Sequence, residues 1–155
     1  MYKSGMTKSP DRHELVESGC AFWFHDNDQV RSPFPARIQP QLKQNAEAAF
    51  MEWVRNLTKQ DRKEVDDDEL VGVFEMLLFN EALKLVGDED PDLVLTIHYP
   101  FLPRIGDEVN DETHGPSRVV DRKLEQKEDK QLYMKLFLEN QASRTPWETE
   151  ILIPA

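Results

Sequence analysis

The chain has 155 residues, of which 39% are hydrophobic and 32% are charged, and its formal net charge at pH 7 is −11. This composition predicts a soluble globular protein of one domain, and the negative charge argues against direct binding to nucleic acids or anionic membranes. It favours protein partners, basic ones in particular. The single cysteine, Cys20, excludes an intramolecular disulfide and suits a cytoplasmic protein. No stretch reaches the roughly 18 apolar residues of a membrane-spanning helix.

The N-terminal part predicts a short helix followed by an aromatic hairpin. Residues 1–8 are polar and are expected to be flexible. A serine–proline pair then marks a helix start, and Gly19 marks a stop, which together predict a helix over residues 10–18. The apolar, aromatic run at 20–25 favours a strand, and turn residues after it allow a returning strand over 29–32.

The middle of the chain predicts two main helices. Apolar residues recur at three- and four-residue spacing over 41–57, which indicates an amphipathic helix. A capping pattern favours a short helix over 59–64. The acidic residues 66–69 suit the positive end of the next helix, residues 70–86, which is apolar almost all round and is therefore expected to be buried on several sides. Gly87 predicts its end.

The C-terminal part predicts an antiparallel sheet. Apolar and mixed positions alternate over 92–99, which favours a strand, and shorter strands are expected near 107–109, 117–124, 132–139 and 147–153. Short connections predict antiparallel neighbours. The whole chain, 1–155, is therefore expected to form a single α+β domain in which two main helices pack against a curled β-meander, SH3-like or small barrel-like. Its mainly helical half, with the aromatic hairpin, is 9–87, and its β half is 88–155. The side chains expected in the core are apolar and inward-facing: Phe50, Trp53, Val54, Leu57, Leu70, Phe74, Leu77, Leu78, Leu95, Ile97, Leu136 and Ile151.

A histidine and carboxylate cluster is the weak candidate for catalysis. It consists of His98, Asp107, Asp111 and His114. A histidine held by a carboxylate can serve as a general base. A polar loop with surface histidines is the simpler interpretation, so the sequence favours a protein that is not an enzyme and leaves the question open.

Neither a metal site nor a cofactor is predicted. Asp88, Asp90 and Asp92 have the spacing of a calcium loop, but Leu93 stands where glycine is needed and Tyr99 where an acid is needed. Motifs typical of nucleotide and zinc enzymes are also absent from the sequence.

Two other polar features have structural interpretations. Residues 25–28 offer a histidine and two carboxylates, but their adjacency favours a turn over a metal site. Cys20 has small and apolar neighbours, which favour a buried side chain over a nucleophile.

Two apolar features are candidate binding residues. Phe101, Leu102 and Arg104 belong to a Pro-x-x-Pro segment, which either docks in an aromatic groove or, as we expect, anchors a crossover with its apolar residues buried. Phe79 and Met76 are excess apolar surface on the helix over 70–86. They are expected either to pack under the N-terminal aromatic hairpin or to form a two-fold homodimer interface, which we slightly favour.

The sequence therefore leaves three functions open. The first is a non-enzymatic protein-interaction module. The alternative is a small hydrolase or ligand-binding domain that uses the region of His98 and His114. The third is an acidic mimic of nucleic acid that inhibits a basic protein, and its motive is the net charge alone.

Overall fold

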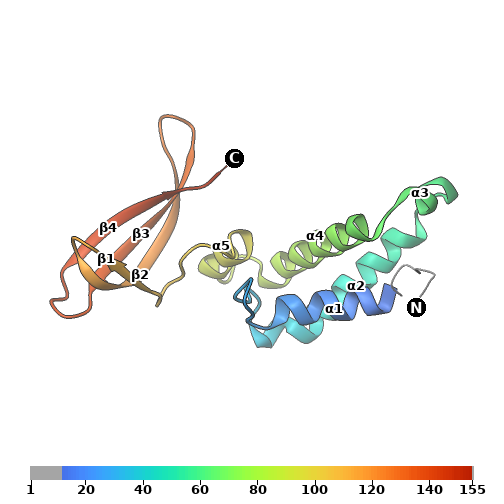
Figure 1. Ribbon diagram of the computed structural model, residues 1–155, viewed down its shortest axis with the longest axis horizontal. Helices are drawn as coiled ribbons and strands as arrows, with labels where there is room; N and C mark the ends of the chain where they lie inside the picture. The colour runs from blue at the N-terminus through green and yellow to red at the C-terminus, as the bar shows by residue number, and fades with distance from the viewer. Residues whose placement is uncertain (1–11, 155) are drawn as a thin grey trace. The chain divides into compact units, whose positions relative to one another are not determined.

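The computed structural model describes residues 12–154, and the chain divides into two compact units, residues 1–101 and 102–155 (Figure 1). The division follows Phe101, whereas the sequence predicts one domain with its α-to-β boundary at residue 87. The expected flexible start, residues 1–8, lies outside the described residues.

The first unit is helical. Its elements are α1 (Arg12–Phe24), the 3-10 helix η1 (Ala36–Ile38), α2 (Gln39–Arg55), α3 (Lys59–Glu64), α4 (Asp67–Val86) and α5 (Pro91–His98). Local chemistry sets several of the ends. Thr58 and Asp61 form a reciprocal capping box at α3, and the Asp66 side chain caps α4. Gly87, at a φ of 60°, ends α4 as the sequence predicts.

The predicted aromatic hairpin is wrong, because α1 continues through Gly19 to Phe24. A Cβ atom at Gly19 would stand 2.6 Å from the Phe74 ring, so this glycine serves close packing between helices and not a helix stop. The helix ends where Asn27 donates a side-chain hydrogen bond to the Phe22 carbonyl at 2.9 Å.

The predicted strand over 92–99 is also wrong, because this segment is helix α5. Asp90 caps it by accepting a hydrogen bond from the Leu93 amide at 3.1 Å, and Pro91 occupies the first turn. The side chains of Thr96 and Ile97 are buried. Over eight residues a period of two and a period of 3.6 share many positions, so the caps decide between them.

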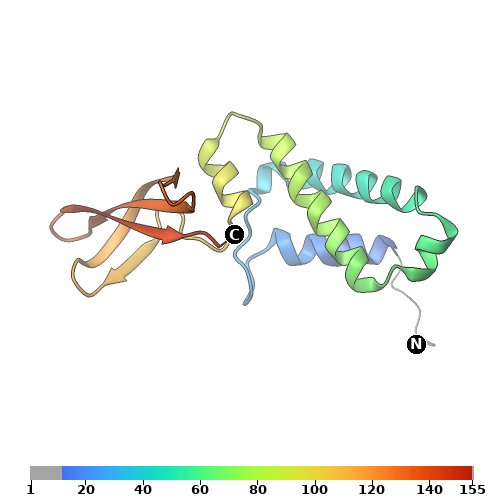
Figure 2. The same cartoon turned by 90° about the horizontal axis from the view of Figure 1, so that it is seen from above.

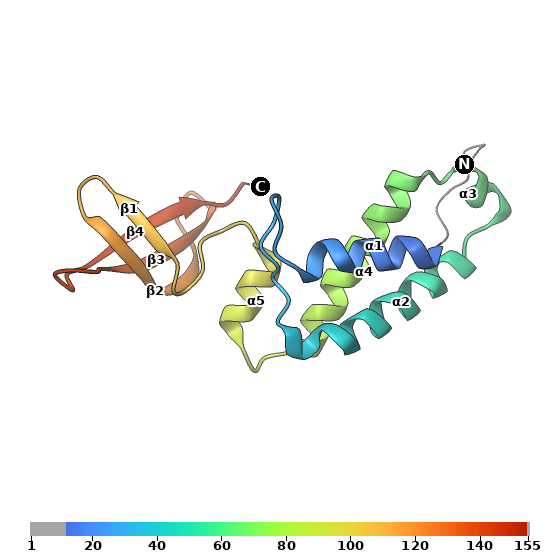
Figure 3. The same ribbon diagram turned by 60° about the horizontal axis from the view of Figure 1, so that its bottom comes forward.

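The three long helices form the core of the helical unit. Figures 2 and 3 show α4 passing across α1 and α2, and contacts join each pair of these helices. The centroids of the Phe50 and Phe74 rings lie 5.6 Å apart, and the rings meet edge to face where α2 contacts α4. The expected core residues of this unit that are buried are Phe50, Val54, Leu70, Phe74, Leu78 and Ile97. The half-buried ones are Trp53, Leu57, Leu77 and Leu95.

The second unit is a curled antiparallel sheet in the order β1-β2-β3-β4. Its strands are β1 (Glu108–Asp111), β2 (Gly115–Gln126), β3 (Leu132–Asn140) and β4 (Pro146–Leu152). The α+β class with a small barrel-like sheet is therefore confirmed. Of the core residues predicted here, Leu136 is buried and Ile151 is half-buried.

A bulge in β2 changes which side chains point inward. The pairing with β3 shifts between Val119 and Asp121, so Val119 and Arg122 are both buried although they are three residues apart. Arg122 donates from Nη1 to the Pro103 carbonyl at 2.8 Å. The sheet thus buries a charged side chain beside its apolar residues.

Among residues 12–154, no helix combines the length and apolar character needed to cross a membrane.

Candidate functional site

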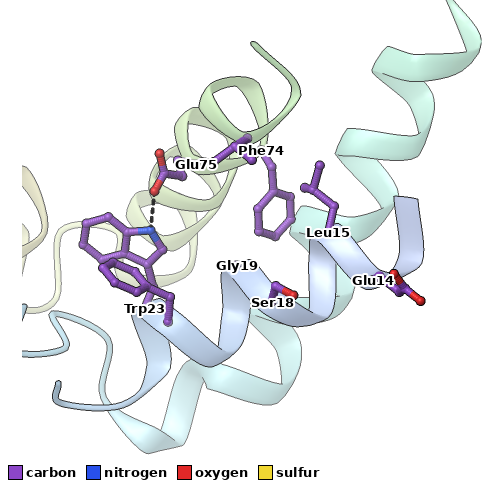
Figure 4. A pocket seen from close by; sticks show the side chains of 9 residues that line it. Glu14, Leu15, Ser18, Gly19, Trp23, Phe74 and Glu75 are labelled. Carbon is purple, nitrogen blue, oxygen red and sulfur yellow. Dashed lines mark hydrogen bonds between the residues drawn. The ribbon is translucent and has the colours of Figure 1, made fainter. Parts of the chain in front are cut away.

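An apolar groove lies between α1 and α4 in the helical unit (Figure 4). Its volume is about 400 Å³, within the range of about 300–1,000 Å³ typical of ligand pockets. The α1 residues that line it are Glu14, Leu15, Ser18, Gly19, Phe22 and Trp23. The α4 residues that line it are Val71, Phe74 and Glu75.

The floor of the groove is the contact between Gly19 and Phe74. The Phe74 ring is buried and lies against the α1 backbone at the position where Gly19 has no side chain (Figure 4). Any larger residue at this position would have to displace the ring. The groove therefore depends on one glycine.

The walls of the groove expose apolar side chains to solvent. Phe22 is 38% exposed and Val71 is 43% exposed. At one end, Trp23 packs edge to face on Phe79, with 4.8 Å between the ring centroids. Its indole nitrogen donates to the Glu75 carboxylate at 2.7 Å, which holds both side chains in place (Figure 4).

The two helices run in the same general direction along the groove. Gly19 faces Phe74, and Trp23, one turn later, contacts Phe79. Glu14 therefore lies at the same end as the acidic first turn of α4, residues 67–69. Among the described residues that line the groove, the charged side chains are Glu14 and Glu75, and both are acidic.

The predicted binding residues have different environments. Phe79 is half-buried against Trp23 and Phe34, so it packs inside the helical unit. Trp23 belongs to helix α1 and not to the expected hairpin. Met76 is 53% exposed and does not line the groove. Phe101 is 71% exposed, so it is not the buried anchor that its proline-rich context predicts.

The other two residues of that segment open the sheet unit. Leu102 and Arg104 are half-buried there. The Arg104 amide donates to the Asp107 carboxylate at 2.8 Å, so Asp107 holds the turn before β1.

One pair of the predicted catalytic residues comes together in the sheet unit. The Nδ1 atom of His114 lies 2.7 Å from Asp111 Oδ2. The hydrogen bond with the His114 side chain, and then that with its backbone amide, hold the pKa of Asp111 below its usual value. The His114 ring stacks on Trp147, with centroids 4.1 Å apart and planes within 4°. His98 belongs to α5 in the helical unit.

This pair borders a small hollow of about 270 Å³. The hollow is lined by Thr113, His114, Asn140, Ser143, Thr145 and Trp147. Trp147 is fixed by a hydrogen bond from its indole nitrogen to Ser117 Oγ at 2.9 Å. The arrangement presents a carboxylate-oriented imidazole beside a polar cavity, which is suited to binding a small polar group or to accepting a proton from one.

Two other candidates lack the chemistry of a site. Cys20 is buried, and burial raises the pKa of its thiol to about 11, so the thiol stays protonated near neutral pH. Among residues 12–154, no three histidine, cysteine, aspartate or glutamate side chains are grouped so that they could hold a metal ion. Asp90, from the alternating aspartates, acts as the N-cap of α5.

Sequence reasoning missed the groove because it ended the first helix at Gly19. Leu15, Gly19 and Trp23 recur at intervals of four residues, which is the spacing of one helix face. That spacing indicates a helix that continues through the glycine, and it would have placed Phe22 on the surface beside this face.

Comparison of the chain with family models, with curated proteins and with solved structures gave no match.

Proposed function

We propose that the chain is a non-enzymatic protein-interaction module and that the groove between α1 and α4 is its binding surface. The observation that carries this proposal is the exposure of Phe22 and Val71 on the two walls of an apolar cavity of about 400 Å³. Exposed apolar patches with polar rims are typical of interaction sites. Aromatic side chains in such patches supply much of the binding energy.

The shape of the groove favours a helical segment of a partner. From Glu14 to Trp23, α1 rises by about 13 Å, which matches two to three turns of a bound helix. Apolar side chains at three- and four-residue spacing on such a helix would enter between Phe22 and Val71, as in other helix-in-groove complexes. The floor is already formed by Phe74, so little rearrangement is needed before binding.

The test is selection of helical peptides from a displayed random library against the full chain, followed by NMR mapping of the bound peptide. We expect shifts of the Leu15, Gly19 and Val71 amides. Val71→Glu should abolish binding, since it places a charge in the apolar wall. Met76→Glu is the matched control, because it adds the same charge to α4 outside the groove. Selected peptides that map elsewhere, or that bind Val71→Glu normally, would refute the proposal.

A second candidate function is a ligand-binding or hydrolytic site at His114. It is favoured by the 2.7 Å contact between His114 and Asp111, which leaves Nε2 of the ring as the atom available to a ligand. The stacked Trp147 restricts the orientation of the imidazole. The hollow beside it could hold only a small molecule.

This candidate is tested with a library of small polar fragments and with a p-nitrophenyl ester as a general substrate. Fragment binding should shift the Trp147 indole resonance, and His114→Ala should abolish that shift. Ester hydrolysis should fall in the same variant, while His98→Ala serves as the control. If no fragment shifts Trp147 and the ester is hydrolysed equally by the His114→Ala variant, the site has neither role.

A further inference from the structure

We propose that the occupant of the groove between α1 and α4 is a basic amphipathic helix of another protein, whose lysine or arginine side chains pair with Glu14 and Glu75. This inference rests on the proposed function and specifies the chemistry of the partner. It predicts an apolar stripe on the partner helix with basic residues on its borders.

The charges at the groove carry the first step. Within the part of the chain that the structure describes, Glu14 and Glu75 are the charged residues of its lining, and they come from different helices. Basic groups bordering a bound helix would therefore find a carboxylate on the α1 side and another on the α4 side. Pairs of this kind set specificity and association rate more than affinity.

Glu75 is the more informative of the two acids. Favourable interaction with the helix dipole accounts for acidic residues in a first turn, and Glu14 and residues 67–69 occupy such turns. Glu75 lies in the middle of α4, where the dipole gives no such advantage. Its carboxylate is oriented by the Trp23 indole at 2.7 Å, so it is held at the edge of the apolar cavity.

The charge of the whole helical unit supports the same partner. Residues 1–101 contain eleven lysines and arginines and nineteen aspartates and glutamates, a formal charge of −8. Residues 102–155 contain eight and eleven, a formal charge of −3. Most of the negative charge thus belongs to the unit that contains the groove, and it would attract a basic segment over about one Debye length.

The same charges disfavour a second copy of this chain as the occupant. Two helical units in contact would bring like charges within the screening length of about 8 Å at physiological salt. A homodimer through the groove would also place Glu14 and Glu75 of each copy against an acidic surface. A different protein with basic residues avoids both costs.

The experiment uses three fluorescein-labelled helical peptides with the full chain. They share one face of leucines at three- and four-residue spacing, and they differ only in flanking residues, which are lysine, glutamine or glutamate. Binding is measured by anisotropy at low and at physiological salt. We expect the lysine peptide to bind about fivefold tighter than the glutamine peptide at low salt, as two exposed ion pairs would give, and the difference should shrink with added salt.

Charge variants locate the effect. The double variant Glu14→Gln/Glu75→Gln should remove most of the preference for lysine, while the side-chain amide oxygen introduced at position 75 can still accept the Trp23 hydrogen bond. Glu89→Gln, in the turn after α4, is the control and should leave the preference unchanged. Val71→Glu adds a negative charge to the groove wall. If net charge alone attracted the lysine peptide, its affinity would rise in this variant, whereas if the peptide docks in the groove, its affinity should fall.

The outcomes separate the two proposals. If the lysine and glutamine peptides bind equally and Val71→Glu abolishes the binding of both, the inference that the partner is basic is overturned. The proposed interaction function then remains. Failure of all three peptides would refute the interaction function as well. Sedimentation that shows a dimer disrupted by Val71→Glu but not by Met76→Glu would identify a second copy as the occupant and overturn the inference.

Discussion

The helical unit and the sheet unit place their apolar and polar side chains differently. The helical unit buries a continuous cluster of aliphatic and aromatic residues and still exposes apolar side chains along a groove. The sheet unit buries Val119 and Leu136 together with the polar Ser117 and the charged Arg122. The sheet unit also exposes large apolar side chains, namely Ile105, Val120 and Leu152, but in the helical unit the exposed Phe22 and Val71 line one apolar groove. An interaction surface is therefore expected in the helical unit.

The largest expected effect is that of Phe74→Ala on the helical unit. Phe74 is buried between α1 and α2, so its truncation should lower the free energy of unfolding by about 3–5 kcal/mol. Hydrogen exchange in denaturant would assign the loss to amides of α2 and α4, with β2 and β3 unaffected. Phe101→Ala, at an exposed position, is the control. A loss below about 1 kcal/mol would contradict the described packing.

The sheet unit should respond most to Arg122→Met. This change removes a buried donor and leaves the Pro103 carbonyl unpaired, which should cost about 1–3 kcal/mol. The loss should appear in β2 and β3 amides alone. Arg118→Met, on the same strand but exposed, should change stability by less than about 0.5 kcal/mol. Equal effects of the two variants would mean that Arg122 contributes nothing from its buried position.

Two glycines test whether the groove floor is specified by close packing. Gly19→Ala would place Cβ 2.6 Å from the Phe74 ring, and such overpacking should lower stability by about 1–2 kcal/mol after the gain in helix propensity. Gly72→Ala should raise stability by about 0.5–1 kcal/mol, because beyond its chain neighbours and the nearby backbone of its own helix no described atom lies within 4 Å of the added Cβ. Thermal melting measures both. Stabilisation by Gly19→Ala would show that the floor can relax.

The smallest effect concerns the pH dependence of the sheet unit. The pKa of Asp111 is held below its usual value mainly by His114, so the ionised carboxylate stabilises the folded state. That contribution is fully present above the unfolded pKa and is lost as the pH falls through the lower, folded pKa. The melting temperature of Asp111→Asn should therefore lie below that of the parent near neutral pH, and the gap should close in acid. Glu112→Gln, at the adjacent exposed position, is the control, and a gap independent of pH would contradict the assignment.

Local signals predicted much of the fold. The periodicity of α2 and α4 and the capping pattern of α3 are properties of short stretches, and the structure has these helices close to the expected residues. Alternation of apolar and mixed positions predicts β3 and β4 for the same reason, and β2 also lies close to an expected strand. In contrast, α5 was predicted as a strand because eight residues are too few for periodicity to decide, although the Asp90–Pro91 start was visible in the sequence.

The candidate sites differ in the same way. The contact between Asp111 and His114 spans three residues of one turn, so the sequence could suggest it. The groove requires α1 and α4, which are about fifty residues apart in the chain, and its floor depends on the meaning of Gly19. A glycine that ends a helix and a glycine that admits a neighbouring ring are identical in sequence. The difference is set by tertiary packing.

The hydrogen bond between Trp23 and Glu75 also makes the groove optically observable. Indole emission depends on the polarity around the ring, and Trp23 stands at the groove edge with its nitrogen on a carboxylate. Trp23 is 9% exposed, so its ring is already largely shielded from water, but a basic side chain of a bound helix that pairs with Glu75 would change the electric field at the indole nitrogen, and the intrinsic fluorescence should change on binding without any label. Trp53 and Trp147 do not line the groove and would contribute a constant background. The chain therefore contains its own reporter of occupancy.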